Sequence, residues 1–206
     1  MYALVHNNQV VVGPRQWSAA FFIRWLSDNL NLENVVLKEE QVPIVIDAST
    51  KLLKVTSLIV PECNHKIQQF SGPHWTIHST HITGEYTLVD KEVNTVKNEL
   101  KNLVAAKRYE KEIGGLDLGD GTIIRTDPES QAKLTGAWAR VQRKPNTLID
   151  WKGSNGWVKL NKTAIENLAD AIGDHVQACF TAEKDKIDEI DACTTLQELD
   201  AINLEL

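Results

Sequence analysis

The sequence has few of the residues that mark secreted, disulfide-bonded or membrane-spanning proteins. Its three cysteines, Cys63, Cys179 and Cys193, are widely spaced and form no Cys-x-x-Cys pair. This set fits free thiols in a reducing compartment better than a disulfide framework. No stretch approaches the roughly 20 apolar residues of a membrane span, and the first residues lack a basic segment followed by an apolar run. We therefore expect a soluble protein that is made in the cytosol.

An excess of positive charge is also missing. The chain has 22 Lys and Arg against 28 Asp and Glu, which gives a formal net charge of −6. The imbalance is spread along the chain, with 6 basic and 8 acidic residues in positions 1–90 and the remainder in positions 91–206. Proteins that bind nucleic acid need a basic surface for the phosphates. Nucleic acid is therefore a poor candidate for a partner.

The first 90 residues have the pattern of a small α+β domain. Residues 2–12 predict a hairpin that turns at Asn7 and Asn8 and ends at Gly13-Pro14, and residues 16–30 have helical spacing. Residues 35–89 form short runs rich in Val, Ile and Thr that predict antiparallel strands. Pro43 indicates a sheet edge, because proline cannot donate a hydrogen bond to a neighbouring strand.

The helix predicted over residues 16–30 is apolar around much of its circumference. Phe22, Trp25, Leu26 and Leu30 share one face, while Trp17, Phe21 and Ile23 widen it beyond a single stripe. Either the sheet of the same domain covers this helix, or a partner or second subunit does. In the second case Trp17, Phe21 and Trp25 would form the interface.

Residues 91–113 predict a connector helix between two domains. Val93, Val96, Leu100 and Leu103 recur at steps of three and four, the spacing of a coiled-coil seam. The seam lasts for only about two heptads. It leaves two alternatives: self-association into a homo-oligomer, or packing of the helix on its own domain.

Residues 114–206 predict a second α+β domain made of two hairpins and three helices. One hairpin turns at Gly119-Asp120-Gly121, and a helix begins after the cap residue Asp127. A second hairpin spans 148–160, and Asn161 caps a long helix. Thr195 and Glu198 have capping-box spacing, so a short last helix completes a helical hairpin.

Several motifs of this second half occur together and in order. They are Lys107-Arg-Tyr-Glu110, Gly114-Gly115, Arg125-Thr-Asp127, Glu129-Ser-Gln-Ala-Lys-Leu134, Gly156-Trp-Val-Lys-Leu160, His175-Val-Gln-Ala-Cys-Phe180 and Ile190-Asp-Ala-Cys-Thr-Thr-Leu-Gln-Glu-Leu199. Residues from about 107 to 204 resemble an uncharacterised domain found in tailed-bacteriophage tail-fibre, baseplate-associated and tail-assembly proteins. The resemblance implies no catalytic or cofactor residues, and it does not extend to residues 1–106.

No spacing in the sequence predicts catalysis. The chain lacks GxxxxGK[ST], GxGxxG and GxSxG motifs. His65, His74, His78 and His81, with Cys63 nearby, could form a polar strand face, a pH-responsive interface or a metal site. Along one strand, His81 would point away from His74 and His78, so we expect no metal. The acidic run at 185–191 alternates with lysines and predicts a solvated helix face.

Three tryptophans lie in the second half of the chain, and two of them belong to the predicted hairpin at 148–160. Trp138, Trp151 and Trp157 predict core packing, with a sugar-binding cleft as the alternative. We expect a protein that is not an enzyme and has no cofactor. We interpret it as a structural component of a phage tail: an oligomeric adaptor near the baseplate or tail-fibre attachment that binds other tail proteins. It would be synthesised in the host cytoplasm and located in the virion tail. The alternatives are a tail-fibre assembly chaperone and, more weakly, a carbohydrate-binding module.

Overall fold

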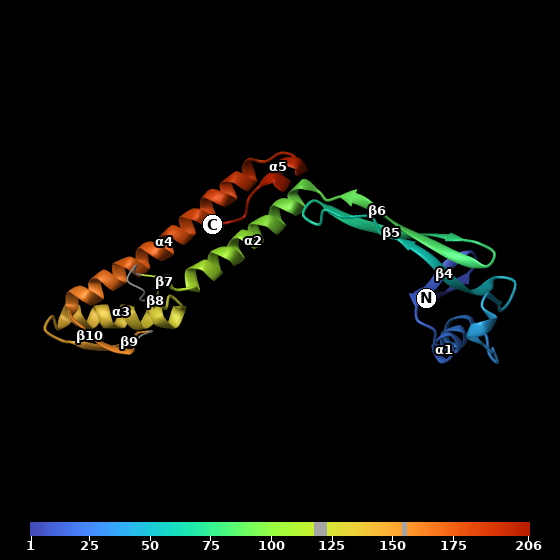
Figure 1. Cartoon of the computed structure of the whole chain (residues 1–206), viewed down its shortest axis with the longest axis horizontal. Coiled ribbons are helices and arrows are strands. Elements are labelled where there is room, and N and C mark those ends of the chain that lie inside the picture. Colours follow the sequence, from blue (N-terminus) through green and yellow to red (C-terminus); the bar gives the residue numbers. More distant parts are fainter. Residues whose placement is uncertain (118–122, 154–155) are drawn as a thin grey trace. The chain divides into compact units, whose positions relative to one another are not determined.

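The chain divides into two compact units, Met1–Lys91 and Glu92–Leu206. A computed structural model describes residues 1–117, 123–153 and 156–206 (Figure 1). Helices and strands occur in both units, which confirms the α+β prediction. None of the helices among these residues is long and apolar enough to cross a membrane.

The first unit is one sheet with a helix on it. Its strand order is β2-β1-β4-β6-β5, and β3 pairs with β4 beside this path. The strands are β1 (Tyr2–His6), β2 (Gln9–Arg15), β3 (Ile44–Val45), β4 (Thr50–Ile59), β5 (Gln68–Ile77) and β6 (His81–Asp90). The helices are α1 (Ala19–Leu30) and a 3-10 turn, η1 (Glu39–Gln41).

The first hairpin turns where the sequence predicts. Asn7 and Asn8 have φ angles of 49° and 58°, the left-handed values that a tight hairpin turn requires. The predicted end at Gly13-Pro14 is wrong, because β2 continues to Arg15. A proline is tolerated there because β2 lies at the sheet edge. Pro43 directly precedes β3, which pairs only with β4, in agreement with the predicted edge position.

One ladder of this sheet is parallel, although antiparallel strands were predicted. Residues Lys54–Ile59 of β4 pair in parallel with β6, while Thr50–Lys54 pair antiparallel with β1. The cause lies in the order of the strands. The chain leaves β4, returns along the outer strand β5 and reverses again into β6, so β4 and β6 run in the same direction.

The two faces of the sheet carry separate apolar clusters. Leu4 and Leu52 face α1 and pack with its buried Phe22 and Leu26. Their sequence neighbours point to the opposite face, as the alternation of a strand demands, and form a second cluster there. This cluster consists of Ala3, Val5, Leu53, Val55 and Ile82, with Val10, Trp75 and Ile77 packed against it.

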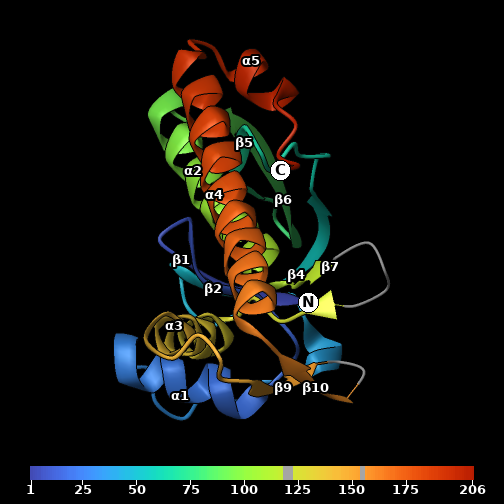
Figure 2. The same ribbon diagram turned by 90° about the vertical axis from the view of Figure 1, so that its left-hand side faces the viewer.

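The second unit is built on two helices that lie side by side. Figures 1 and 2 both show α2 (Val93–Ile113) running along α4 (Lys162–Ala192). The remaining elements are β7 (Leu116–Asp117), β8 (Ile123–Ile124), α3 (Pro128–Arg143), β9 (Ile149–Gly153), β10 (Gly156–Leu160) and α5 (Leu196–Ala201). The predicted turn at 119–121 lies outside the described residues, as do Ser154 and Asn155.

Local capping fixes where the helices of this unit begin. The Asp127 carboxylate accepts a hydrogen bond from the Ser130 backbone N–H over 3.1 Å. The Asn161 side chain accepts one from the Ala164 N–H over 2.9 Å. Thr195 and Glu198 form the full capping box of α5. All three predicted helix starts are therefore confirmed.

Two groups of buried side chains hold the second unit together. On α2, Val96, Leu100 and Val104 are buried where this helix packs on α4 and α5. Between α3 and α4 lies a cluster of Leu134, Ala137, Val141, Ile165, Leu168 and Ile172. Trp151 and Leu160 of the β9–β10 hairpin pack against this second cluster. The hairpin is thereby held over α4.

Candidate functional site

The three aromatic residues predicted as an interface on α1 pack largely within their own unit. Trp17, Phe21 and Trp25 are partly buried against the cluster between α1 and the sheet. The Trp17 ring meets Tyr2 edge-on at 5.2 Å between centroids, and the Arg15 guanidinium lies 3.4 Å from the centre of Phe21. The sheet of the same unit therefore covers part of this apolar surface, and an interface at Trp17, Phe21 and Trp25 stays a prediction.

The four residues of the predicted helix seam do not lie on one exposed face. Val96 and Leu100 are buried in the second unit, while Val93 is partly exposed and Leu103 is 52% exposed. The buried stripe continues from Leu100 to Val104 in place of Leu103. Val96 and Leu100 pack inside the chain, as in the second alternative of the sequence interpretation.

The histidines lie differently from the single strand on which the sequence reasoning placed them. His78 follows the end of β5 and His81 begins β6, so the turn between them brings both rings together. The rings stack with centroids 4.3 Å apart. The expectation that His81 points away from His78 is wrong for this reason. Across the described residues, no group of three or more His, Cys, Asp or Glu is placed to hold a metal ion.

Two of the three tryptophans predicted as core residues are exposed. Trp151 of β9 pairs with Val158 of β10 and faces α4. Trp157, the residue before Val158, pairs with Lys152 and faces outward. Trp157 is 72% exposed, and Trp138 on α3 is also exposed. The core prediction was wrong for both residues. For Trp157 the cause is that a hairpin packed on one helix can bury only one of its faces. Trp138 lies on α3 outside the buried stripe of Leu134, Ala137 and Val141.

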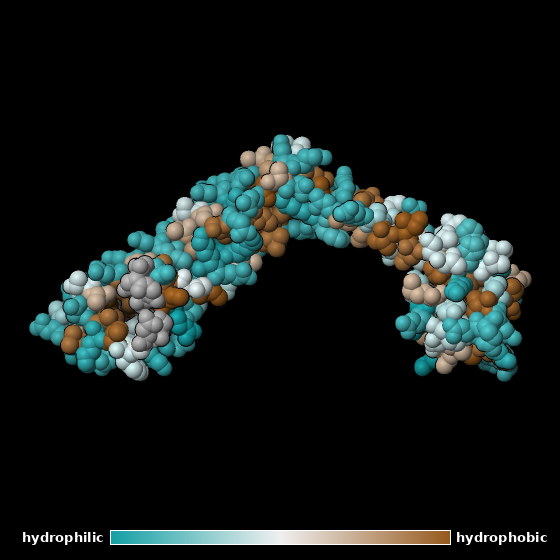
Figure 3. Space-filling model, viewed as in Figure 1, coloured by the Kyte–Doolittle hydropathy of each residue, from teal (hydrophilic) through white to brown (hydrophobic). Residues whose placement is uncertain are grey.

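A large hollow of the second unit lies under the inner face of this hairpin. Its volume is about 760 Å³. Trp151, Val158 and Leu160 line it from the hairpin, Leu168 from α4 and Ile124 from β8. We call this hollow the hairpin groove. Apolar side chains also reach the surface at this end of the unit, as the brown residues in Figure 3 show.

The polar residues of the hairpin groove lie at its rim. Arg125, Lys152, Ser130 and Asn167 are in the lining, and no His, Cys, Asp or Glu is among the described residues that line it. Arg125 forms an ion pair with Asp127 over 3.1 Å. The Ser130 hydroxyl and backbone N–H hold the pKa of Asp127 below its usual range. The described lining can therefore offer apolar contact and the cations Arg125 and Lys152, and the groups that most often transfer protons near neutral pH are not among its described residues.

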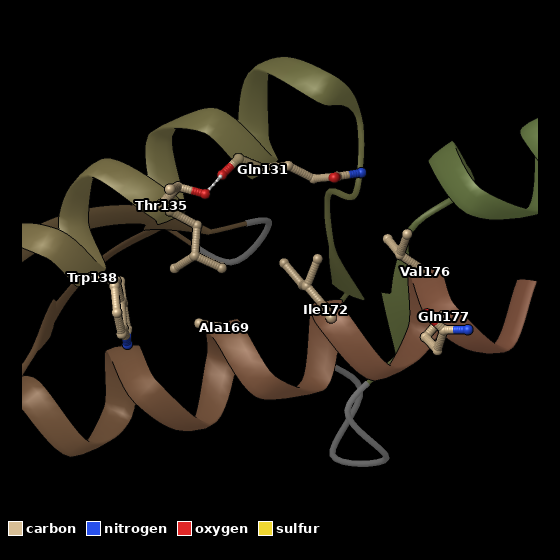
Figure 4. Close-up of a pocket in the computed structure, with 9 residues that line it drawn as sticks. Gln131, Thr135, Trp138, Ala169, Ile172, Val176 and Gln177 are labelled. Carbon is tan, nitrogen blue, oxygen red and sulfur yellow. Dashed lines mark hydrogen bonds between the residues drawn. The ribbon is translucent and has the colours of Figure 1, made fainter. Parts of the chain in front are cut away.

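A smaller hollow lies between α3 and α4. Its volume is about 280 Å³, and Figure 4 shows Trp138 pointing from α3 toward Ala169 on α4. Gln131 and Thr135 border it, and the Thr135 hydroxyl donates a hydrogen bond to the Gln131 carbonyl over 2.9 Å. Its polar groups are thus partly engaged within α3.

A partly buried charged cluster joins α2 to α4. The Arg108 guanidinium donates to Glu183 of α4 and to Glu112 of α2, and it lies 4.5 Å from the centre of the Phe180 ring. Nearby, Nε2 of His175 lies 3.2 Å and 3.3 Å from the carbonyl oxygens of Lys111 and Glu112. The contacts of His175 give a partner to backbone carbonyl oxygens in the last turn of α2, which have no hydrogen-bond donor within the helix. The cluster has a structural explanation, since every charge in it has a partner.

Sequence reasoning missed both the hairpin groove and the Arg108 cluster. The groove had a usable signal in the sequence. Val158 and Leu160 are two residues apart on one predicted strand, and Trp151 on the other strand pairs with Val158. That alternation predicts one apolar face. The contact between Arg108 and Glu183 had none, since these residues are separated by 75 positions in the sequence.

The comparisons with known proteins identify a family for the second unit. A family model described as a domain of unknown function (DUF4376) matches residues 95–203, which are more than half of the chain. The match takes in most of α2 and all of the described residues from α3 to α5. Neither the curated proteins nor the solved structures include a match to this chain.

Proposed function

Because the chain belongs to the DUF4376 family, a family of unknown function, we propose its role from its surfaces: it is a structural, non-enzymatic adaptor of a bacteriophage tail. It acts near the baseplate or the tail-fibre attachment as a homo-oligomer. Support for the phage tail comes from the ordered motifs between Lys107 and Leu199, which resemble those of a domain in tail proteins. These motifs include the start of α3, all of β10 and the capping box of α5.

The hairpin groove is the observation that carries the adaptor role. It combines apolar walls formed by Trp151, Val158 and Leu168 with an open position on the surface. An exposed apolar surface with a polar rim is typical of a site for protein association. Its described lining offers no His or carboxylate for acid-base chemistry. Binding explains this combination of residues better than catalysis does.

The division into two units also supports an adaptor. Met1–Lys91 and Glu92–Leu206 each have their own apolar core. A chain with two separately packed units can contact two neighbours through different surfaces. In this proposal the second unit uses the hairpin groove for one of these contacts.

Mass spectrometry of purified phage particles tests the proposal. The adaptor role requires the protein at a copy number comparable to that of other minor tail proteins. A host cytosolic protein of similar abundance in the infected cell serves as the contamination control. Presence in infected cells but absence from particles would refute the virion role and support the assembly-chaperone alternative.

One observation favours a carbohydrate-binding module as a second candidate. Trp157 is 72% exposed on the outer face of the hairpin, beside Lys152 and the Lys159–Asp150 ion pair. A flat aromatic surface next to polar groups can stack on a sugar ring. A glycan array probed with the wild type and with Trp157→Ala tests this candidate. Binding that Trp157→Ala does not reduce would exclude Trp157 as the platform.

A further inference from the structure

His78 and His81 meet across the tight turn that joins β5 to β6. The His78 backbone N–H donates to the His81 carbonyl over 2.9 Å, and Ser79 and Thr80 lie between them. The two imidazole rings stack with centroids 4.3 Å apart and planes inclined by 14°. The expectation of no metal assumed that both residues lie on one strand. The turn removes that reason for these two histidines.

Each ring has one nitrogen beside a threonine hydroxyl. Nε2 of His78 lies 3.3 Å from Oγ1 of Thr83, and Nδ1 of His81 lies 3.3 Å from Oγ1 of Thr80. Within the part of the chain that the structure describes, Nδ1 of His78 and Nε2 of His81 have no protein hydrogen-bond partner. Histidines that bind metal ions have this arrangement: one nitrogen coordinates the ion while the other contacts a group that orients the ring.

The position and chemistry of the two rings suit an ion that prefers nitrogen ligands. His78 is exposed and His81 partly exposed, so both side chains can rotate at the surface. An imidazole–metal bond is about 2.0–2.1 Å long, so two nitrogens that share one ion lie roughly 3 Å apart. Rings that already stack at 4.3 Å need only small rotations to reach this separation. Imidazole suits Zn²⁺, Ni²⁺ and Cu²⁺, whereas Mg²⁺ and Ca²⁺ prefer oxygen ligands.

We infer that His78 and His81 together chelate one divalent transition-metal ion of the class of Zn²⁺, Ni²⁺ and Cu²⁺. Nδ1 of His78 and Nε2 of His81 are the protein ligands, and water completes the coordination shell. The ion joins the end of β5 to the start of β6, and it stabilises the first unit because it binds the folded turn in preference to the unfolded chain. The inference is independent of the proposed adaptor role.

A neighbouring positive charge opposes the ion. Lys54 of β4 is the register partner of His81, and its side chain is exposed. Because water screens charges at the surface, this repulsion weakens the site without abolishing it. Lys54→Gln should therefore tighten metal binding by roughly twofold to fivefold.

Isothermal titration calorimetry of the untagged full chain with NiCl₂ tests the inference. At neutral pH the chain should bind one Ni²⁺, while MgCl₂ should give no saturable heat. Binding should weaken as the pH falls below about 6.5, because a protonated imidazole cannot coordinate a metal. Added Ni²⁺ should also raise the urea midpoint of the wild type.

Paired variants connect this binding to the turn. His78→Ala and His81→Ala should each weaken Ni²⁺ binding by about tenfold or more, since even the loss of a residue that only orients a ligand costs about 10- to 100-fold. His74→Ala is the matched control, because His74 is an exposed histidine of β5 whose ring contacts Thr87 instead. It should leave Ni²⁺ binding within about twofold. Far-ultraviolet circular dichroism checks that each variant keeps its fold.

A nuclear magnetic resonance measurement locates the ion without any substitution. Paramagnetic Ni²⁺, added below one equivalent, should broaden the imidazole signals of His78 and His81 before those of His65 and His74. Three results would overturn the inference. They are no saturable binding up to about 1 mM Ni²⁺, equal weakening by His74→Ala and His78→Ala, and earlier broadening of the His65 or His74 signals.

Discussion

Arg108 on α2 donates from Nε to Oε2 of Glu183 on α4 over 2.9 Å, and the two side chains are only 16% and 15% exposed. This pair joins two helices that are far apart in sequence. Arg108 also contacts Glu112, so its replacement leaves two partly buried carboxylates without their cation. The cost of such uncompensated groups exceeds what an exposed pair contributes.

Arg108→Met should therefore lower the free energy of unfolding by about 1–3 kcal/mol. Urea denaturation followed by circular dichroism measures the change. Lys184→Ala removes one partner of the exposed Lys184–Asp188 pair and should change stability by less than about 0.5 kcal/mol. Equal effects of the two variants would show that burial does not strengthen the Arg108 cluster.

Leu100 and Leu103 provide a matched test of which face of α2 is internal. Leu100→Ala should cost about 2–5 kcal/mol, because its side chain is buried and its removal leaves a cavity. Leu103→Ala should cost less than about 0.5 kcal/mol, since that side chain is half exposed. The same urea experiment compares them.

Leu103 also gives the appropriate test of self-association through α2. Val96→Asp with Leu100→Asp would place charges in the core and unfold the second unit, so that pair cannot report on an interface. If copies associate through the exposed face of α2, Leu103→Asp should shift the mass measured by light scattering toward the monomer. An oligomer that persists in this variant would place the interface elsewhere.

Acid should destabilise the second unit through Glu198. The backbone N–H groups of Thr194 and Thr195 donate to its carboxylate and hold its pKa below the usual range. A carboxyl group whose pKa is lower in the folded state stabilises the fold when the pH is above its unfolded-state pKa of about 4.3. This contribution is lost as the pH falls through the folded-state pKa.

Glu198→Gln should therefore be less stable than the wild type at neutral pH and should lose less stability in acid. Urea midpoints measured from neutral pH to about pH 3 test the slope. Asp127→Asn should act in the same direction, because Ser130 lowers the pKa of that carboxyl group. Parallel curves for wild type and Glu198→Gln would contradict this account of α5.

Limited proteolysis should cut the chain near residues 90–92. The two units meet there in sequence, between the end of β6 and the start of α2. Cleavage in residues 104–113 is disfavoured, because α2 is helical throughout and packs on α4. Fragments 1–91 and 92–206 should each give a cooperative unfolding transition when expressed alone. A fragment without one would show that its unit needs the other to fold.

The features that sequence predicted well are set by neighbouring residues. Asp127, Asn161 and Thr195 each receive a hydrogen bond from a backbone N–H three residues later, so the pattern of a few residues is sufficient. The turn at Asn7 and Asn8 is equally local. Such signals survive in almost any tertiary context.

The features that sequence missed depend on distant partners. Spacing alone did not distinguish Leu103 from Val104 as the inward residue of α2, because the position of α4 decides it. The parallel pairing of β4 with β6 depends on where β5 lies. Likewise, Trp151 and Trp157 differ because only one face of their hairpin meets α4. The hairpin groove follows from this last choice.

The pairing of α2 with the far end of α4 has a consequence during synthesis. Lys97 donates to the backbone of Asp191, 94 residues later, and α2 also packs on α5. At about 5–20 residues per second, a ribosome needs roughly 5–20 seconds to produce these partners after α2 emerges. During that interval Val96, Leu100 and Val104 lack the side chains from the end of α4 and from α5 that pack against α2 in the folded protein. Chains truncated before Ile190 should retain this exposure permanently and sediment as aggregates, whereas the full chain should stay in the supernatant.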